Sequence, residues 1–228
     1  MKRFFLISFV AISVVELIAL VSSFTLLAVV AKPLIIATLV GYYYYSTRIP
    51  KRSLIFLSGL LFCWAGDVLL LFQSEAELFF ICGLFSFLVG HILYIITYRQ
   101  HRSEETENGL LSTQKIRFSL PVILAGTGLV VVLFPLLGDL KIPVLIYAIV
   151  IIVMVMNALF RYGRTSPASF WMVFAGALLF QLSDSLLAIN KFYAPFPFSD
   201  FWVMLTYIGA QYLIVQGVID HTLKYEPK

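Results

Sequence analysis

Eight long apolar segments, separated by short polar stretches, make up most of this sequence. A helix that crosses the roughly 30 Å of bilayer hydrocarbon needs about 20 residues, and each segment has about that length. The pattern therefore predicts eight transmembrane helices, over residues 4–21, 24–45, 53–72, 77–98, 117–137, 142–160, 167–190 and 198–219. The first boundary is the least distinct, because Ser22 and Ser23 make a poor loop and Lys32-Pro33 is a second place for the next helix to begin.

The composition indicates the same fold class, an all-α polytopic membrane protein. Hydrophobic residues make up 61% of the 228 residues, charged residues make up 12%, and the mean hydropathy is +0.97. A soluble domain of this length does not normally show such values. We expect a single eight-helix transmembrane domain over residues 1–228. The N-terminal MKRFFLISFV has the basic start of a signal peptide, but no small-residue cleavage site follows, so we interpret it as the first helix.

Lysine and arginine fall at alternate ends of the predicted helices. Of the 16 lysines and arginines, all but three lie on the same side of the membrane as the N-terminus. The exceptions are Lys32, Lys141 and Lys191. Because basic residues collect on the cytoplasmic side of membrane proteins, we expect both termini to be cytoplasmic, in a bacterial inner membrane. This topology accounts for the net charge of +4 without a nucleic-acid partner. The longest loop, 99–115, carries glutamates beside its basic residues and is interpreted as a solvated linker.

Two of the apolar segments contain an aspartate. Asp67 lies in LLFCWAGDVLLLF and Asp184 in GALLFQLSDSLLAINKF. A charge inside hydrocarbon is costly, so such a residue is a candidate for function. Both aspartates start an Asp-x-Leu-Leu sequence, in the third helix of each predicted group of four, which is the pattern of two parallel four-helix repeats. Apolar helices also resemble one another by chance, and the sequence leaves both interpretations open.

Polar side chains from several predicted helices come to a similar depth. At about 1.5 Å per residue, five of them fall at one level in the outward half of the membrane, and Gln211 lies a little deeper; the five are Glu16, Lys32, Asp67, Asp184 and Tyr207. His91, Tyr94 and Asn157 fall nearer to the cytoplasmic side. An ionised carboxylate in hydrocarbon needs a partner or a proton, so a shared cavity is expected, with Lys32 as the counter-ion. A neutral carboxyl beside an ionised one is an arrangement that acid–base catalysis uses.

Structural roles are the alternative for the same residues. Glu16 and Lys32 would also serve as an ion pair that fixes helix register, and buried aspartates can do the same. A histidine on an apolar helix, as His91 is, often only bonds within the bundle. The sequence has no Gly-rich phosphate loop, no G-x-S-x-G and no H-E-x-x-H, and its three histidines are too few and too scattered for the zinc sites of membrane hydrolases. We therefore expect neither a metal nor a cofactor.

Several short motifs resemble, in order and spacing, those of the YhhN-like family of membrane proteins, which includes the mammalian lysoplasmalogenases. The matching residues are Lys32-Pro33-Leu34, Gly66-Asp67, Gly90-His91 with Tyr94, Gly176-Ala177 through Phe180 and Ser183-Asp184, and Gln211 with Gly217. The resemblance covers essentially the whole chain. It implies an eight-helix enzyme that hydrolyses the vinyl ether bond of lysoplasmalogens to a fatty aldehyde and glycerophosphoethanolamine or glycerophosphocholine.

Carboxylates suit the implied reaction. A vinyl ether is cleaved by protonation of its β-carbon, addition of water to the oxocarbenium ion, and collapse of the hemiacetal. One carboxylic acid donates the proton, and one carboxylate stabilises the cation and accepts a proton from water, as in glycosidases. Asp67 and Asp184 are predicted to fill these roles, in an order that the sequence does not fix.

The other polar candidates are predicted to bind or orient the substrate. Lys32 would set the charge state or meet the phosphate, Tyr207 and Gln211 would orient the head group or water, and the further substrate-binding candidates are Glu16, His91, Tyr94, Asn157 and Ser183. A lipid or small-molecule transporter that uses the same buried polar cluster is the main alternative, followed by a structural membrane subunit. The sequence leaves the oligomeric state open.

Overall fold

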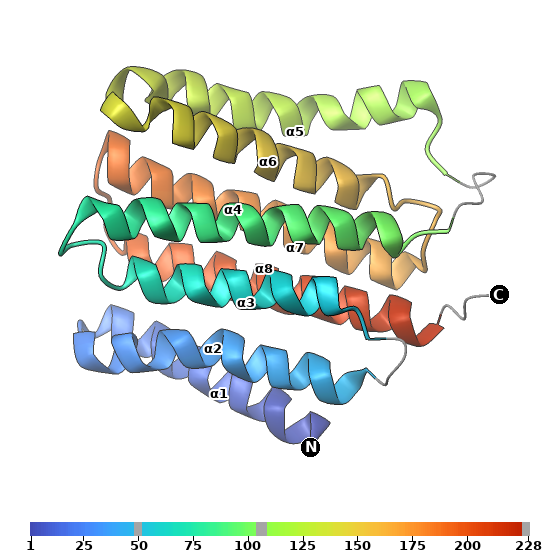
Figure 1. The fold of residues 1–228 in the computed structure, drawn as a ribbon, viewed down its shortest axis with the longest axis horizontal. Helices are drawn as coiled ribbons and strands as arrows, with labels where there is room; N and C mark the ends of the chain where they lie inside the picture. The colour runs from blue at the N-terminus through green and yellow to red at the C-terminus, as the bar shows by residue number, and fades with distance from the viewer. Residues whose placement is uncertain (48–51, 104–108, 225–228) are drawn as a thin grey trace. The chain divides into compact units, whose positions relative to one another are not determined.

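The computed structural model describes residues 1–47, 52–103 and 109–224. These parts contain eight α-helices: α1 (Lys2–Val21), α2 (Thr25–Ser46), α3 (Leu54–Leu70), α4 (Glu77–Gln100), α5 (Ser112–Leu133), α6 (Lys141–Leu159), α7 (Pro167–Ala188) and α8 (Ser199–Lys224). Two 3₁₀ turns, Phe134–Leu136 and Gly138–Leu140, connect α5 to α6, and a π-helical turn over Ile189–Tyr193 follows α7. The all-α prediction is confirmed (Figure 1).

Seven of the helical segments are long and apolar enough to cross a membrane, and α3, with 17 residues, is the shorter eighth. Large apolar side chains remain exposed along them, as at Val131, which is 72% exposed, and Ile142, which is 70% exposed. A surface of this kind is stable against lipid rather than water. The chain is therefore an integral membrane protein.

The helix ends differ from the prediction where helices extend past their apolar part. α5 begins at Ser112 rather than 117, because Gln114 Oε1 accepts a hydrogen bond (2.9 Å) from the Leu111 N–H and so caps a polar first turn. α4 and α8 likewise continue to Gln100 and Lys224. The basic residues Arg48, Lys51 and Lys228, and the glutamates of the loop that was interpreted as a linker, lie outside the described residues.

Contacts between residues divide the chain into two compact units, Met1–Tyr94 and Ile95–Lys228. The boundary lies within α4, close to the division between the two predicted groups of four helices. The single domain and the internal repeat both stay predictions.

In the first unit, the helices follow one another as neighbours, and α3 and α4 approach closely through glycine. A Cβ added at Gly66 would lie 2.6 Å from the Phe87 ring, and one at Gly90 would lie 3.2 Å from the Gly59 carbonyl oxygen. Ser86 Oγ donates a 2.7 Å hydrogen bond to the Phe62 carbonyl across the same interface. Small residues and hydroxyl bonds of this kind replace the hydrophobic effect between helices in lipid.

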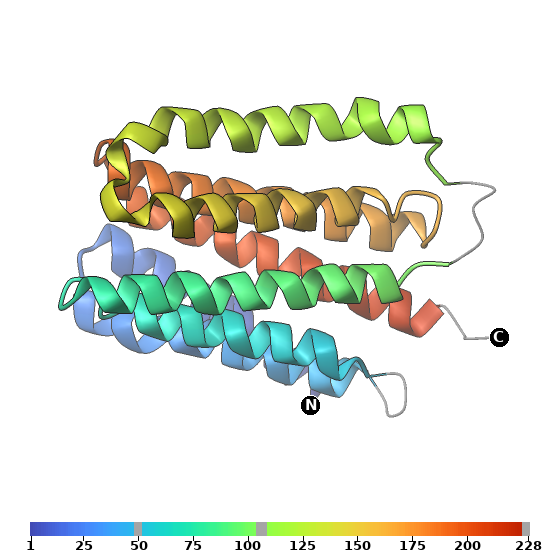
Figure 2. The same ribbon diagram turned by 45° about the horizontal axis from the view of Figure 1, so that its top comes forward.

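In the second unit, α7 and α8 form the closest pair, visible in both ribbon views (Figures 1 and 2). Ser169 Oγ donates to the Gly217 carbonyl at 2.7 Å, and Ser183 Oγ donates to the Val203 carbonyl at 2.9 Å. These two bonds lie near opposite ends of α7. α7 also packs against α6, so it lies between α6 and α8.

Candidate functional site

Three charged side chains of the predicted site come together in the first unit. Glu16 on α1 and Asp67 on α3 are 1% and 2% exposed, and Lys32 on α2 is half-buried. Both Lys32 and Asp67 lie within electrostatic range of the Glu16 carboxyl. The depth count from sequence therefore identified residues that three different helices bring into one polar cluster.

The helix that carries Lys32 is held to the helix that carries Asp67 by a tryptophan. Trp64 Nε1, one turn before Asp67, donates a 3.0 Å hydrogen bond to the Pro33 carbonyl, the residue after Lys32. Pro33 lies inside α2, where it removes one backbone donor from the helix. The Trp64 bond thus fixes the α2 and α3 backbones next to the two charges.

His91 and Tyr94 lie on α4 and are both fully buried. The Tyr94 ring packs 5.3 Å from the Phe56 ring, and its hydroxyl lies 3.9 Å from Cys63 Sγ. The His91 ring lies 6.5 Å from the Phe87 ring. The Tyr94 contacts join α4 to α3, whereas His91 and Phe87 lie one turn apart on α4 itself. A role for either residue in substrate binding stays a prediction.

Asp184, in the second unit, is bonded to a residue that the sequence analysis missed. The Tyr147 hydroxyl donates a 2.6 Å hydrogen bond to Asp184 Oδ2, from α6 to α7. Tyr147 is 9% exposed and Asp184 is half-buried. A tyrosine in an apolar helix gives no signal by itself. The depth count would have found it, because Tyr147 lies about five residues, or roughly 8 Å, below the outer face, close to the level of Asp184.

Tyr207 and Gln211 lie one turn apart on α8 and are 4% and 0% exposed. Gln211 Nε2 donates to the Tyr207 hydroxyl at 3.2 Å, and the Tyr207 ring meets the Phe180 ring edge to face at 5.4 Å. Phe180 and Ser183 thus contact α8, whereas Asp184 contacts α6. The Phe-x-x-Ser-Asp sequence uses two faces of α7, one for packing and one for the carboxylate.

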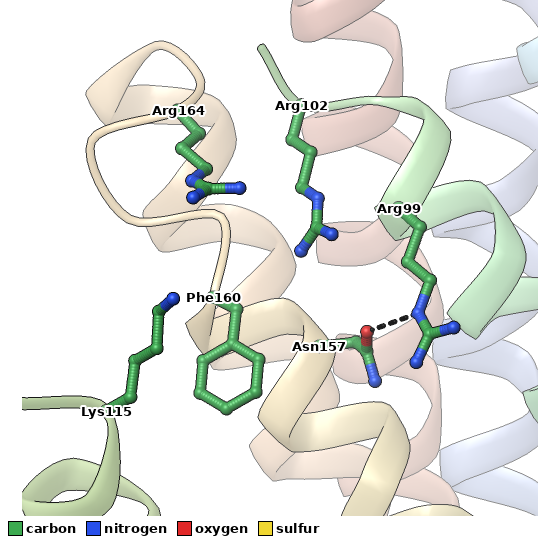
Figure 3. A pocket seen from close by; sticks show the side chains of 6 residues that line it. All are labelled: Arg99, Arg102, Lys115, Asn157, Phe160 and Arg164. Carbon is green, nitrogen blue, oxygen red and sulfur yellow. Dashed lines mark hydrogen bonds between the residues drawn. The ribbon is translucent and has the colours of Figure 1, made fainter. Parts of the chain in front are cut away.

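Asn157 lies elsewhere in the second unit. It is ten residues beyond Tyr147 on α6, about 15 Å along the helix axis. Its Oδ1 accepts a 2.9 Å hydrogen bond from Arg99 Nε, and its Nδ2 donates to the Val153 carbonyl. It lines a cavity, here called the basic pocket, together with five other residues: Arg99, Arg102, Lys115, Phe160 and Arg164 (Figure 3).

Within the described ranges, no group of three or more His, Cys, Asp and Glu side chains is placed to hold a metal ion.

A sequence model of the YhhN family matches residues 27–218. The chain is 32% identical to Lysoplasmalogenase TMEM86A of Bos taurus over 174 residues, which cover 75% of this chain and 67% of that protein. It is 30% identical to Lysoplasmalogenase TMEM86B of Homo sapiens over 164 residues, which cover 72% of this chain and 63% of that protein. The match thus spans less than two thirds of the human relative. No solved structure matches the chain.

Proposed function

Because the chain belongs to the YhhN family, we propose that it is an integral membrane hydrolase that cleaves the vinyl ether bond of lysoplasmalogens. The products are a fatty aldehyde and glycerophosphoethanolamine or glycerophosphocholine. The family match carries this proposal, since residues 27–218 include both Asp67 and Asp184 and the relatives are named lysoplasmalogenases.

Asp67 and Asp184 supply the acid and the carboxylate. The acid transfers its proton to the β-carbon of the vinyl ether, which gives an oxocarbenium ion. Water then adds to the adjacent carbon and loses a proton to a carboxylate, and the hemiacetal collapses to aldehyde and alcohol. The Tyr147 hydroxyl donor at Oδ2 supports Asp184 as the carboxylate that faces the cation and the water, which leaves the proton transfer to Asp67.

The polar neighbours of these carboxylates hold the substrate and set the charge state of the carboxyl groups. Lys32 balances the negative charge of Glu16 and Asp67, and the burial of these two carboxyl groups supports this role. Ser183, Tyr207 and Gln211 lie on the α7–α8 side of Asp184, where they orient the head group or the water. His91 and Tyr94 are assigned more distant contacts with the lipid, and Asn157, which is bonded to Arg99 and Val153, is left out of the substrate site.

The orientation in the membrane follows from the basic residues. Both termini lie in the cytoplasm, because most lysines and arginines gather on their side of the helices. The membrane is the inner membrane of a bacterium.

The test is aldehyde release from lysoplasmalogen by the purified full chain, beside an ordinary acyl lysophospholipid. Asp67→Asn and Asp184→Asn are each expected to abolish aldehyde release while the protein stays folded. The matched control is Asp139→Asn, an exposed aspartate in the turn before α6, which is expected to keep full activity.

Three results would contradict parts of this proposal. Full activity in both aspartate variants would rule out the proposed mechanism. Cleavage of the acyl lipid alone would indicate an ester hydrolase, and movement of the lipid across vesicles without aldehyde would indicate a transporter.

A further inference from the structure

The basic pocket is a cavity of about 290 Å³ within the second unit, on which four cations converge. Arg99 comes from the end of α4, Arg102 from just beyond it, Lys115 from the start of α5 and Arg164 from the connection between α6 and α7. Figure 3 shows these side chains gathered around Phe160 and Asn157. The volume is close to the lower limit for ligand sites, and a phosphate group fits within it.

The backbone around the pocket is fixed by hydrogen bonds. The Ser103 N–H donates to the Arg164 carbonyl at 2.9 Å, which joins the segment after α4 to the segment after α6. Arg161, which is fully buried, donates from Nε to the His101 carbonyl at 3.2 Å and from Nη2 to Ser169 Oγ at 2.9 Å. These bonds hold the segments that carry Arg102 and Arg164 against α7.

The described residues that line the pocket do not balance its charge. None of them is a carboxylate, and in the part of the chain that the structure describes none of the four cations has a carboxylate in an ion pair. Burial, followed by the charges of Arg164 and Arg99, lowers the pKa of Arg102 below its ordinary value. Like charges held this close repel one another, so an anion that enters the pocket removes a cost that the folded protein otherwise carries.

The side chains also fit one kind of anion. Guanidinium groups bind phosphate oxygens with paired N–H donors, and three of the four cations are arginines. The Asn157 amide is already bonded to Arg99 and Val153, so it positions Arg99 rather than serving a ligand. The Phe160 ring forms one apolar wall of the pocket, and Lys115 Nζ lies 5.9 Å from the centre of that ring. Basic pockets between transmembrane helices typically bind lipid phosphates.

We propose that the basic pocket binds a phosphate group, from an anionic lipid head group or from soluble phosphate, as a site separate from Asp184. The two sites are separate because the distance between them is longer than the part of the substrate that would have to join them. Asn157 lies about 15 Å along α6 from Tyr147, the partner of Asp184. Only five bonds join the phosphorus of a lysophospholipid to its ether oxygen, a reach of roughly 6 Å at the spacing of an extended chain. One lipid therefore does not place its phosphate here and its ether at Asp184.

The experiment measures the Tm of the full chain in neutral detergent with added inorganic phosphate, phosphatidylglycerol or phosphatidylcholine. A ligand that binds only the folded state stabilises it by RT ln(1 + [L]/Kd), so Tm rises with ligand concentration and the rise reports Kd. Lys115→Gln and the double variant Arg102→Gln/Arg164→Gln are expected to weaken the apparent affinity by at least about tenfold. Arg117→Gln is the matched control, because Arg117 lies on the same first turns of α5 as Lys115 but is exposed and does not line the pocket.

The ligands distinguish the source of the phosphate. A shift with inorganic phosphate supports a soluble ligand, and a shift with phosphatidylglycerol but not phosphatidylcholine supports an anionic lipid. No shift with any of them overturns the proposal, as does an equal loss in Arg117→Gln, which would indicate surface charge alone.

The loop glutamates provide a further test. Glu104, Glu105 and Glu107 lie outside the described residues and belong to the same connection as Arg102. If only the variant with all three replaced by glutamine binds phosphate, the occupant of the pocket is the chain's own loop and the proposal is wrong.

Discussion

Tyr147→Phe removes a single oxygen atom beside Asp184 and leaves the ring that packs within the second unit. The lost hydroxyl donates at 2.6 Å, within the range of short hydrogen bonds to carboxylates. Tyr147 is only 9% exposed, so water does not readily take its place. Hydrogen bonds to charged groups contribute about 1.5–3 kcal/mol, which corresponds to a roughly 10- to 100-fold fall in kcat/KM.

The assay is the rate of aldehyde release over a range of lysoplasmalogen concentrations. The fall is expected in kcat more than in KM, because Asp184 is proposed to meet positive charge that develops only in the transition state. Tyr162→Phe serves as the control. Tyr162 is 47% exposed and lies in the connection before α7, so its loss of a hydroxyl is expected to leave the rate unchanged.

Unchanged kcat in a folded Tyr147→Phe protein would refute this reasoning, since Asp184 would then work without the hydrogen bond that Tyr147 donates to Oδ2. A fall in Tm that matches the loss of activity would instead show that the bond only stabilises the fold.

Two further predictions concern stability. Gly176→Ala should destabilise the protein by about 1–3 kcal/mol in reversible unfolding, because the new Cβ would lie 2.9 Å from the Ala210 carbonyl oxygen, whereas Gly128→Ala meets nothing within 4 Å and should cost nothing. An equal effect of the two substitutions would contradict the close packing of α7 and α8. Burial lowers the pKa of His101 below its ordinary value of 6.5, so the unfolded chain binds more protons below that pH and Tm should fall as the pH drops through 6.5. His101→Gln should reduce this fall, and an identical pH profile would show that other groups cause it.

Depth along a helix was predictable from the sequence, and rotation about its axis was not. Counting residues placed Glu16, Lys32 and Asp67 at one level, and the structure brings them into one cluster. The same count placed Asn157 near His91. That depth stays a prediction. The count did not indicate that Asn157 accepts a bond from Arg99, whose long side chain reaches back from the end of α4, because a count of Cα positions ignores such reach.

The helices themselves were predictable because the hydrocarbon thickness fixes their length. Their ends were less so, since the apolar pattern marks where hydrocarbon ends rather than where the helix does. Ser112 to Lys115 therefore belong to α5 although they are polar. Tyr147 was missed for a related reason, because one hydroxyl in an apolar helix changes the pattern very little.

The most direct test of vinyl ether hydrolysis is mass spectrometry of the aldehyde that the purified chain releases from lysoplasmalogen in D₂O. Protonation of the β-carbon by a carboxylic acid that exchanges with solvent predicts one deuterium on the carbon next to the aldehyde group. Asp67→Asn should release no such aldehyde. An aldehyde without deuterium, or labelled aldehyde at the full rate from Asp67→Asn, would contradict the proposed chemistry.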